Sequence, residues 1–112
     1  MDNNEVEKAK PLIVVEIINY IPDSFVHESI LSKTTVNFSV VSIDTCEALT
    51  EKASPFDTFV QIIDGKAEIL IDGISNLLET GQCIIMPAHS SHTIKARERI
   101  KMISTTIKSG YE

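Results

Sequence analysis

The chain has 112 residues, of which 43% are hydrophobic, and its formal net charge is −6. This length allows one domain with one hydrophobic core, and the apolar content argues against global disorder. The acidic balance, with no uninterrupted basic patch, excludes a typical nucleic-acid-binding protein.

The N-terminus does not have the composition of a signal peptide. Asp2, Glu5 and Glu7 make it acidic, and Glu16 interrupts the first apolar run. No apolar stretch approaches the length of a membrane span. We therefore expect a soluble, cytoplasmic protein with no membrane partner.

The two cysteines, Cys46 and Cys83, form neither a CxxC pair nor a disulfide framework. Both lie in sequence surroundings that lean towards apolar residues. We expect them to be small buried hydrophobic residues in a reducing compartment.

Residues 1–27 are predicted to form an N-terminal arm that contains one short apolar segment at residues 11–20, PLIVVEIINY. Pro11 suits the first position of a helix, whereas the β-branched residues favour a strand equally well. The pattern leaves helix and strand open. This segment is too apolar to be a free tail, so it must pack against something.

From residue 28 onward, short alternating runs separated by turn signals predict an all-β antiparallel sandwich or barrel. Asp64-Gly65 and Asp72-Gly73 are hairpin signals, and a third turn falls at residues 79–81. The barrel is expected over residues 28–108, followed by a tail at 109–112. The expected strands are 28–33, 36–44, 49–53, 58–63, 66–71, 76–78, 83–86, 92–96 and 100–108.

One expected strand carries apolar residues on both faces. Alternation places Thr58, Val60 and Ile62 on one face, and Phe59 and Ile63 on the other. A strand of this kind is covered on both sides. One side would be the barrel interior, and the other would meet the N-terminal segment or a second subunit, so we expect a homodimer.

A spaced set of residues near the C-terminal half resembles the second sequence motif of the cupins. That motif is Gly, five residues, Pro, one residue, Gly, two residues, His. Gly81, Pro87 and His92 match it, and His89 stands where the second Gly belongs. The resemblance covers about residues 36–107. It implies an antiparallel double-stranded β-helix, the jelly-roll or cupin barrel, with a pocket in its mouth.

The first cupin motif is where the sequence departs from the family. That motif is Gly, five residues, His-x-His, three or four residues, Glu, six residues, Gly. Gly65 matches its end, but Thr58 holds the Glu position, Ser54 and Lys52 hold the His positions, and Cys46 holds the opening Gly position. Metal-binding cupins use the two His, the Glu and the His of the second motif as ligands, so only one ligand of four remains.

The ligand set therefore argues against a metal cofactor. A divalent ion needs three or more converging nitrogen and oxygen donors, and His92 alone does not supply them. The ammonium group of Lys52 would repel a cation, and Asp57 should point away from the interior. We expect no cofactor; if a metal were present, His92 and His89 would be its ligands.

The alternative keeps the pocket and omits the metal. Lys52, Ser54, Thr58 and His92 would line a polar mouth, and a lysine with a histidine favours an anionic ligand. A plainer alternative is a hydrogen-bonded His92 with Lys52 in solvent. A metal-dependent or metal-free cupin enzyme of the isomerase, epimerase or dioxygenase type, using His92 as its catalytic residue, also remains open. The apolar barrel below the mouth is expected to contain Val60, Ile62, Ile69, Ile85 and Ile94.

Overall fold

The computed structural model describes residues 8–51 and 53–108, and it confirms the predicted all-β architecture. One 3-10 turn, η1 (Val14–Glu16), precedes the strands. No helix in the described part of the chain is long and apolar enough to cross a membrane. The strands are β1 (Phe25–Ser32), β2 (Val36–Ile43), β3 (Ala48–Glu51), β4 (Thr58–Asp64), β5 (Lys66–Ile71), β6 (Ile74–Glu79), β7 (Cys83–Met86), β8 (His92–Ala96) and β9 (Ile100–Ile107).

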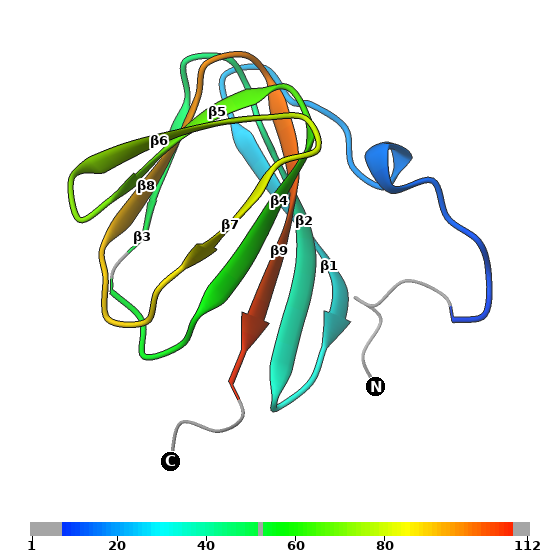
Figure 1. Cartoon of the computed structure of the whole chain (residues 1–112). Helices are drawn as coiled ribbons and strands as arrows, with labels where there is room; N and C mark the ends of the chain where they lie inside the picture. The colour runs from blue at the N-terminus through cyan, green and yellow to red at the C-terminus, as the bar shows by residue number, and fades with distance from the viewer. Residues whose placement is uncertain (1–7, 52, 109–112) are drawn as a thin grey trace.

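The strands form two sheets that face each other as the layers of a jelly-roll barrel (Figure 1). One sheet has the order β1-β2-β9-β4-β7, and the other has the order β3-β8-β5-β6. Every strand pairing is antiparallel. Each strand expected from alternation is present, although β1 begins at Phe25 rather than at residue 28.

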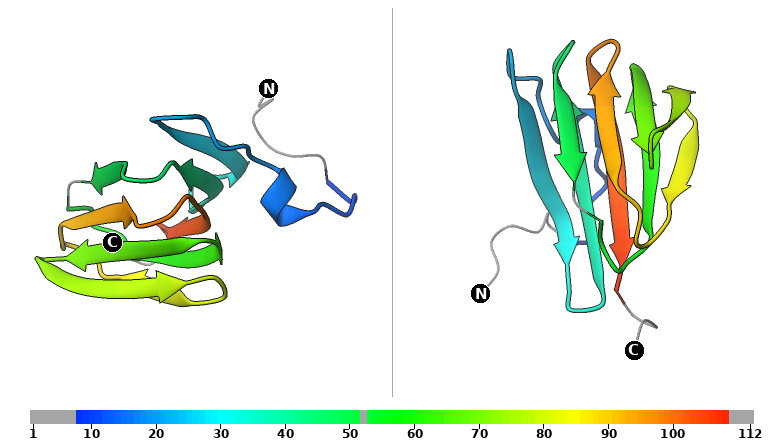
Figure 2. Two further views of the ribbon diagram at one scale, coloured as in Figure 1. Left: turned by 90° about the horizontal axis from the view of Figure 1, so that it is seen from above. Right: turned by 90° about the vertical axis from the view of Figure 1, so that its left-hand side faces the viewer.

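The two ends of the barrel carry different connections. Loops 53–57 and 87–91 lie at the end where β8 begins, which we call the His92 end. Turns 44–47 and 97–99 lie at the opposite end, which we call the far end (Figure 1). Strand β1 projects past the four-stranded sheet, so that sheet does not cover its inner face (Figure 2).

The main core fills the space between the sheets. Val60, Ile62, Ile69 and Ile94 are at most 1% exposed, as the sequence predicted. Their burial follows from alternation, because every second residue of a strand points to the same face. The buried members of this core are Val41, Ile43, Val60, Ile62, Ala67, Ile69, Leu78, Met86, Ile94, Ala96, Ile100 and Met102.

The expectation that Ile85 lines the barrel is wrong. Ile85 is 60% exposed, and its pairing with Phe59 places it on the outer face of the five-stranded sheet. Met86 is buried in the core instead, and Ile84 packs against it. Strand β7 is apolar at four successive positions, so alternation alone does not determine which residues point inward.

A second cluster lies on the outer face of the five-stranded sheet. Ile18 is 3% exposed and packs there with Val40 and Ile103. The apolar N-terminal segment therefore covers part of this face, which was one of the two predicted coverings. Apart from η1 the segment is irregular, and residues 12–15 remain exposed.

Tyr20 fastens the N-terminal segment to the barrel. Its hydroxyl donates a 2.7 Å hydrogen bond to Oδ2 of Asp64. The Arg99 guanidinium lies 4.7 Å and the Lys101 ammonium 5.0 Å from the centre of its ring, within cation–π range. Lys101 Nζ also donates to the carbonyl oxygen of Val15. Burial, followed by the hydrogen bond to Asp64, raises the pKa of the Tyr20 phenol above its ordinary value.

The expected burial of the two cysteines is also wrong, because Cys46 and Cys83 are free and exposed. Cys83 occupies the outward side of β7, opposite Gln61. Cys46 lies in the turn before β3 with a φ of +69°, a conformation that takes its side chain out of strand alternation.

Candidate functional site

Thr58 occupies the position at which the cupin resemblance expects a glutamate. It is the first residue of β4 and is 8% exposed, with Val60 and Ile62 continuing the same inward face towards the far end. Its Oγ1 lies 3.2 Å from Oγ1 of Thr106 on the neighbouring strand β9. A hydroxyl pair therefore stands where a metal-binding relative carries a carboxylate.

His92 faces the barrel interior from the opposite sheet. It is the first residue of β8 and is 6% exposed, and the next inward residue, Ile94, belongs to the core. In the sheet, its backbone pairs with Ile71 on one side and Glu51 on the other. His92 and Thr58 thus face the interior at the same end of the barrel, as predicted.

Hydrogen bonds hold the two loops of the His92 end together. The His89 amide donates to the carbonyl oxygen of Ser54 at 2.6 Å, and the Ala88 amide donates to Asp57 Oδ1 at 2.7 Å. The hydroxyl of Ser90 donates to the Pro87 carbonyl at 2.6 Å. The first two bonds join the loops that border the mouth, and the third lies within loop 87–91.

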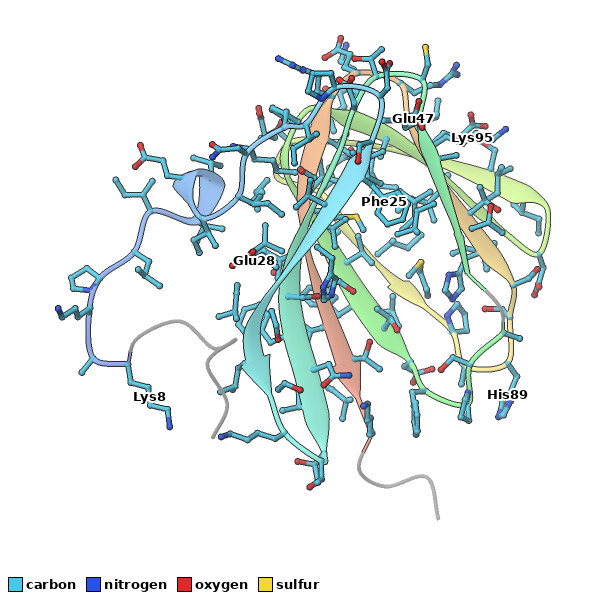
Figure 3. The ribbon with its side chains drawn as sticks, turned by 180° about the vertical axis from the view of Figure 1, so that it is seen from behind. Lys8, Phe25, Glu28, Glu47, His89 and Lys95 are labelled. Atoms are coloured by element: carbon cyan, nitrogen blue, oxygen red, sulfur yellow. The ribbon has the colours of Figure 1, made fainter. Side chains whose placement is uncertain are left out.

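The structure does not place the remaining predicted site residues at the inner face beside Thr58 and His92, or it does not describe them. Ser54 is half-buried, and its Oγ accepts a 3.1 Å hydrogen bond from the amide of Phe56. His89 is exposed on the outer side of its loop (Figure 3), so its side chain does not point into the barrel. Lys52 lies outside the described residues.

The donor set does not fit a tightly bound divalent metal. Within residues 8–51 and 53–108, no three His, Cys, Asp or Glu side chains come together as metal ligands would. Thr58 and Ser54 offer neutral hydroxyls, which are weaker ligands than the carboxylate and imidazole groups that they replace.

The backbone at the motif positions supports the alignment with the cupin motifs. Gly65 and Gly81, which match motif glycines, have φ values of +97° and +93°. Cys46 and His89 stand where the motifs have glycine, and their φ values are +69° and +64°. All four positions thus adopt the left-handed conformation that favours glycine, including the two at which the residue type has changed.

Sequence reasoning missed the polar residues that β9 adds to the interior. Met102, Ser104 and Thr106 alternate along this strand, and Met102 lies in the core, so the other two share its inward face. The alternation along β9 could be read from the sequence. Its neighbouring strands could not be identified in this way, because β2 and β4 are far from β9 in the chain.

Two surface pockets lie towards the far end, away from the predicted site. One has a volume of about 440 Å³ beside the start of β3, between Cys46 and Lys95. The other, also about 440 Å³, lies beside Tyr20 and Arg99. Several of their charged residues form ion pairs, as in the 3.6 Å contact of Arg97 Nε with Glu68 Oε1 and the 3.4 Å contact of Arg99 Nε with Asp44 Oδ1. These pockets therefore resemble a solvated ion-pair surface more than a binding site.

Comparison with solved structures identifies similar folds over nearly the whole chain. A conserved protein of unknown function from Streptococcus pyogenes, SPY1581, is 30% identical, with 94% of this chain and 92% of that chain covered and a TM-score of 0.87. A cupin superfamily protein from Desulfitobacterium hafniense, DSY2733, is 25% identical, with 93% and 94% covered and a TM-score of 0.84.

A cupin 2 conserved barrel domain protein from Leptotrichia buccalis gives a TM-score of 0.89 at 24% identity. The match includes 92% of this chain and 50% of the Leptotrichia protein. No family model matches the sequence, and no curated protein matches it.

Proposed function

Because this chain has the cupin fold, we propose that the His92 end of its barrel binds a small polar or anionic molecule without a tightly bound metal. The observation that carries the proposal is the pair of inward-facing polar residues, Thr58 and His92, above an apolar core. A few convergent polar groups over an apolar cavity are typical of small-molecule sites.

The chemistry of the site favours a metal-free mode of binding. Of the four cupin ligand positions, only that of His92 keeps its family residue. Hydroxyl groups at the positions of Ser54 and Thr58 donate and accept hydrogen bonds, whereas a carboxylate or neutral imidazole binds a cation. The site residues therefore suit an organic ligand better than an ion.

Lys52 and His92 would orient the negatively charged or strongly polar end of such a ligand. A lysine ammonium group forms charge-assisted hydrogen bonds with carboxylates and phosphates. His92 adds a second donor when its ring carries a proton on the ligand-facing nitrogen. Thr58 and Ser54 would complete the polar border.

We also propose that the protein is a homodimer that uses the outer face of the five-stranded sheet. One cross-strand row on this face contains Leu31, Phe38, Thr105, Phe59 and Ile85 in adjacent registers. An apolar row that remains partly exposed is typical of a protein–protein interface. The exposed residues 12–15 lie on the same side of the molecule and would extend that interface.

A cytoplasmic location is consistent with the chemistry of the thiols. Cys46 and Cys83 are both free, and exposed free thiols persist in reducing compartments.

The binding proposal is tested by a thermal-shift screen of sugar phosphates and small carboxylates. A ligand that binds the native protein raises the melting temperature by mass action. We expect His92→Ala and Lys52→Ala to reduce this shift, and His27→Ala, at an exposed histidine, to leave it unchanged. A ligand that shifts all three variants equally would place binding elsewhere, and a stoichiometric metal in untagged protein would contradict the metal-free site.

A further inference from the structure

Three serines form a line across the inner face of the five-stranded sheet. Ser29 of β1 pairs with Ser39 of β2, and Ser39 pairs with Ser104 of β9. Paired residues in an antiparallel sheet share a face. Ser39 and Ser104 each lie two residues from a core residue of the same strand, Val41 and Met102, and therefore point to the same inner face. We call Ser29, Ser39 and Ser104 the serine row.

A second row of hydroxyls lies next to the first, towards the His92 end. Thr106 follows Ser104 two residues later on β9, and it pairs with Thr58 of β4. In such a sheet, neighbouring positions are about 5 Å apart across strands and about 7 Å apart along a strand. The serine row and the threonine pair therefore make a continuous wall of five hydroxyl groups, none of them charged.

The fold leaves the hydrogen-bonding capacity of the serine row unused. Among the described residues, the side chains of Ser29, Ser39 and Ser104 make no hydrogen bond. Ser39 is 6% exposed as a residue, but its Oγ is not among the fully buried side-chain atoms that lack a partner. Water or a ligand therefore has access to this hydroxyl.

The wall is also accessible from solvent. Ser104 and Thr106 lie on the inner face of β9, the central strand of its sheet, yet both are only half-buried. The inner face of a central strand in a closed sandwich would be fully covered. Towards β1 the four-stranded sheet does not cover the wall either, because β1 projects past it (Figure 2). Figure 3 shows Phe25 on this inner side of β1 and Glu28 on the opposite side.

We propose that the wall formed by the serine row, Thr106 and Thr58 binds the hydroxyl groups of a polyhydroxylated small molecule. This inference rests on the proposed function, because it names the class of molecule that binds at the same end of the barrel. A hydroxyl both donates and accepts hydrogen bonds, so a surface of hydroxyls matches a ligand of the same kind. An apolar ligand would leave the serines unsatisfied, and a charged group against this wall would meet no opposite charge from it.

The test is an NMR titration of 15N-labelled protein with two neutral probes, D-glucitol and methyl β-D-glucopyranoside. The first is an open-chain polyol and the second is a ring, so comparing them shows whether the site binds an acyclic polyol or a cyclic sugar. Inorganic phosphate and citrate serve as anionic probes. We expect at least one neutral probe to shift the amide signals of Ser39, Ser104 and Thr106.

Two variants of adjacent residues separate a ligand contact from a structural role. Ser104→Ala removes an inward hydroxyl, and Thr105→Val removes the outward hydroxyl of the next residue. We expect Ser104→Ala to weaken probe binding about two- to tenfold, as one neutral hydrogen bond would, with unchanged or raised thermal stability. Thr105→Val should leave the affinity unchanged.

Each outcome supports or overturns the inference. If phosphate or citrate binds at the His92 end and neither neutral probe does, the polyhydroxyl assignment is wrong and the proposed function stands. If no probe of either kind binds, both are overturned. If Ser104→Ala lowers the stability and leaves the affinity unchanged, the serine row is a structural element and the inference fails.

Discussion

Replacing Gly65 by alanine should destabilise the barrel more than its turn position suggests. Gly65 has a φ of +97°, and an alanine Cβ there would lie 2.0 Å from the carbonyl oxygen of Arg99. This oxygen belongs to the backbone, so it moves only if the turn before β9 moves. That turn is held by hydrogen bonds from the Arg97 and Glu98 amides to the Lys66 carbonyl, at 3.1 and 3.3 Å.

The magnitude follows from two contributions. A left-handed backbone costs a non-glycine residue about 1–2 kcal/mol. Displacing the turn weakens two hydrogen bonds, each of which contributes about 0.5–1.5 kcal/mol. The expected loss of unfolding free energy is therefore about 2–5 kcal/mol, which lowers the melting temperature of a domain of this size by about 10–20 °C.

Gly81→Ala is the matched control. Gly81 has a similar φ of +93°, but no atom lies within 4 Å of the Cβ that an alanine would add. This variant should lose only the backbone contribution of about 1–2 kcal/mol. Urea unfolding followed by circular dichroism measures both variants. Equal losses for Gly65→Ala and Gly81→Ala would refute the steric argument.

Four further predictions concern the motif positions, pH, metal and assembly. Cys46→Gly and His89→Gly should each raise the unfolding free energy by about 0.5–1 kcal/mol in urea titrations, because glycine relieves the left-handed strain, and a loss would contradict this. Hydrogen bonds, led by that from the Asp23 amide, lower the pKa of Asp44. The ionised carboxylate therefore stabilises the fold at pH values above its ordinary pKa, and this stabilisation disappears as the pH falls through the lowered pKa. Acid unfolding of Asp44→Asn should accordingly show a weaker pH dependence than wild type, and identical profiles would exclude this role. Untagged protein should contain well under one equivalent of transition metal by elemental analysis, and chelator should leave its melting temperature unchanged; a stoichiometric, chelator-sensitive metal would oppose this view. Light scattering should give the mass of a dimer for wild type and of a monomer for Ile85→Asp, whereas a monomeric wild type would rule out the interface.

The strands were predictable because they follow from local alternation. Thr58, Val60 and Ile62 point inward as expected, because Thr58 holds the inward Glu position of the cupin motif and alternation places the other two on the same face. Ile85 could not be assigned in the same way, because its whole strand is apolar and its orientation is determined by pairing with Phe59.

The candidate site was predictable only where it depends on a motif. The cupin spacing identified His92, whose inward direction agrees with the structure. The serine row has no such spacing, because Ser29, Ser39 and Ser104 come together only when β1, β2 and β9 pair. Contacts between strands that are distant in the chain depend on topology, and local patterns do not report them.

The position of β9 has a consequence for biosynthesis. This strand is the last one described, yet it lies at the centre of its sheet, between β2 and β4. A nascent chain that has not yet released residues 100–107 cannot join the two halves of the five-stranded sheet, and it presents β2 and β4 as unpaired edges. Unpaired edges are where growing chains aggregate. A stop codon before residue 100 should therefore yield an insoluble product and not a smaller folded barrel.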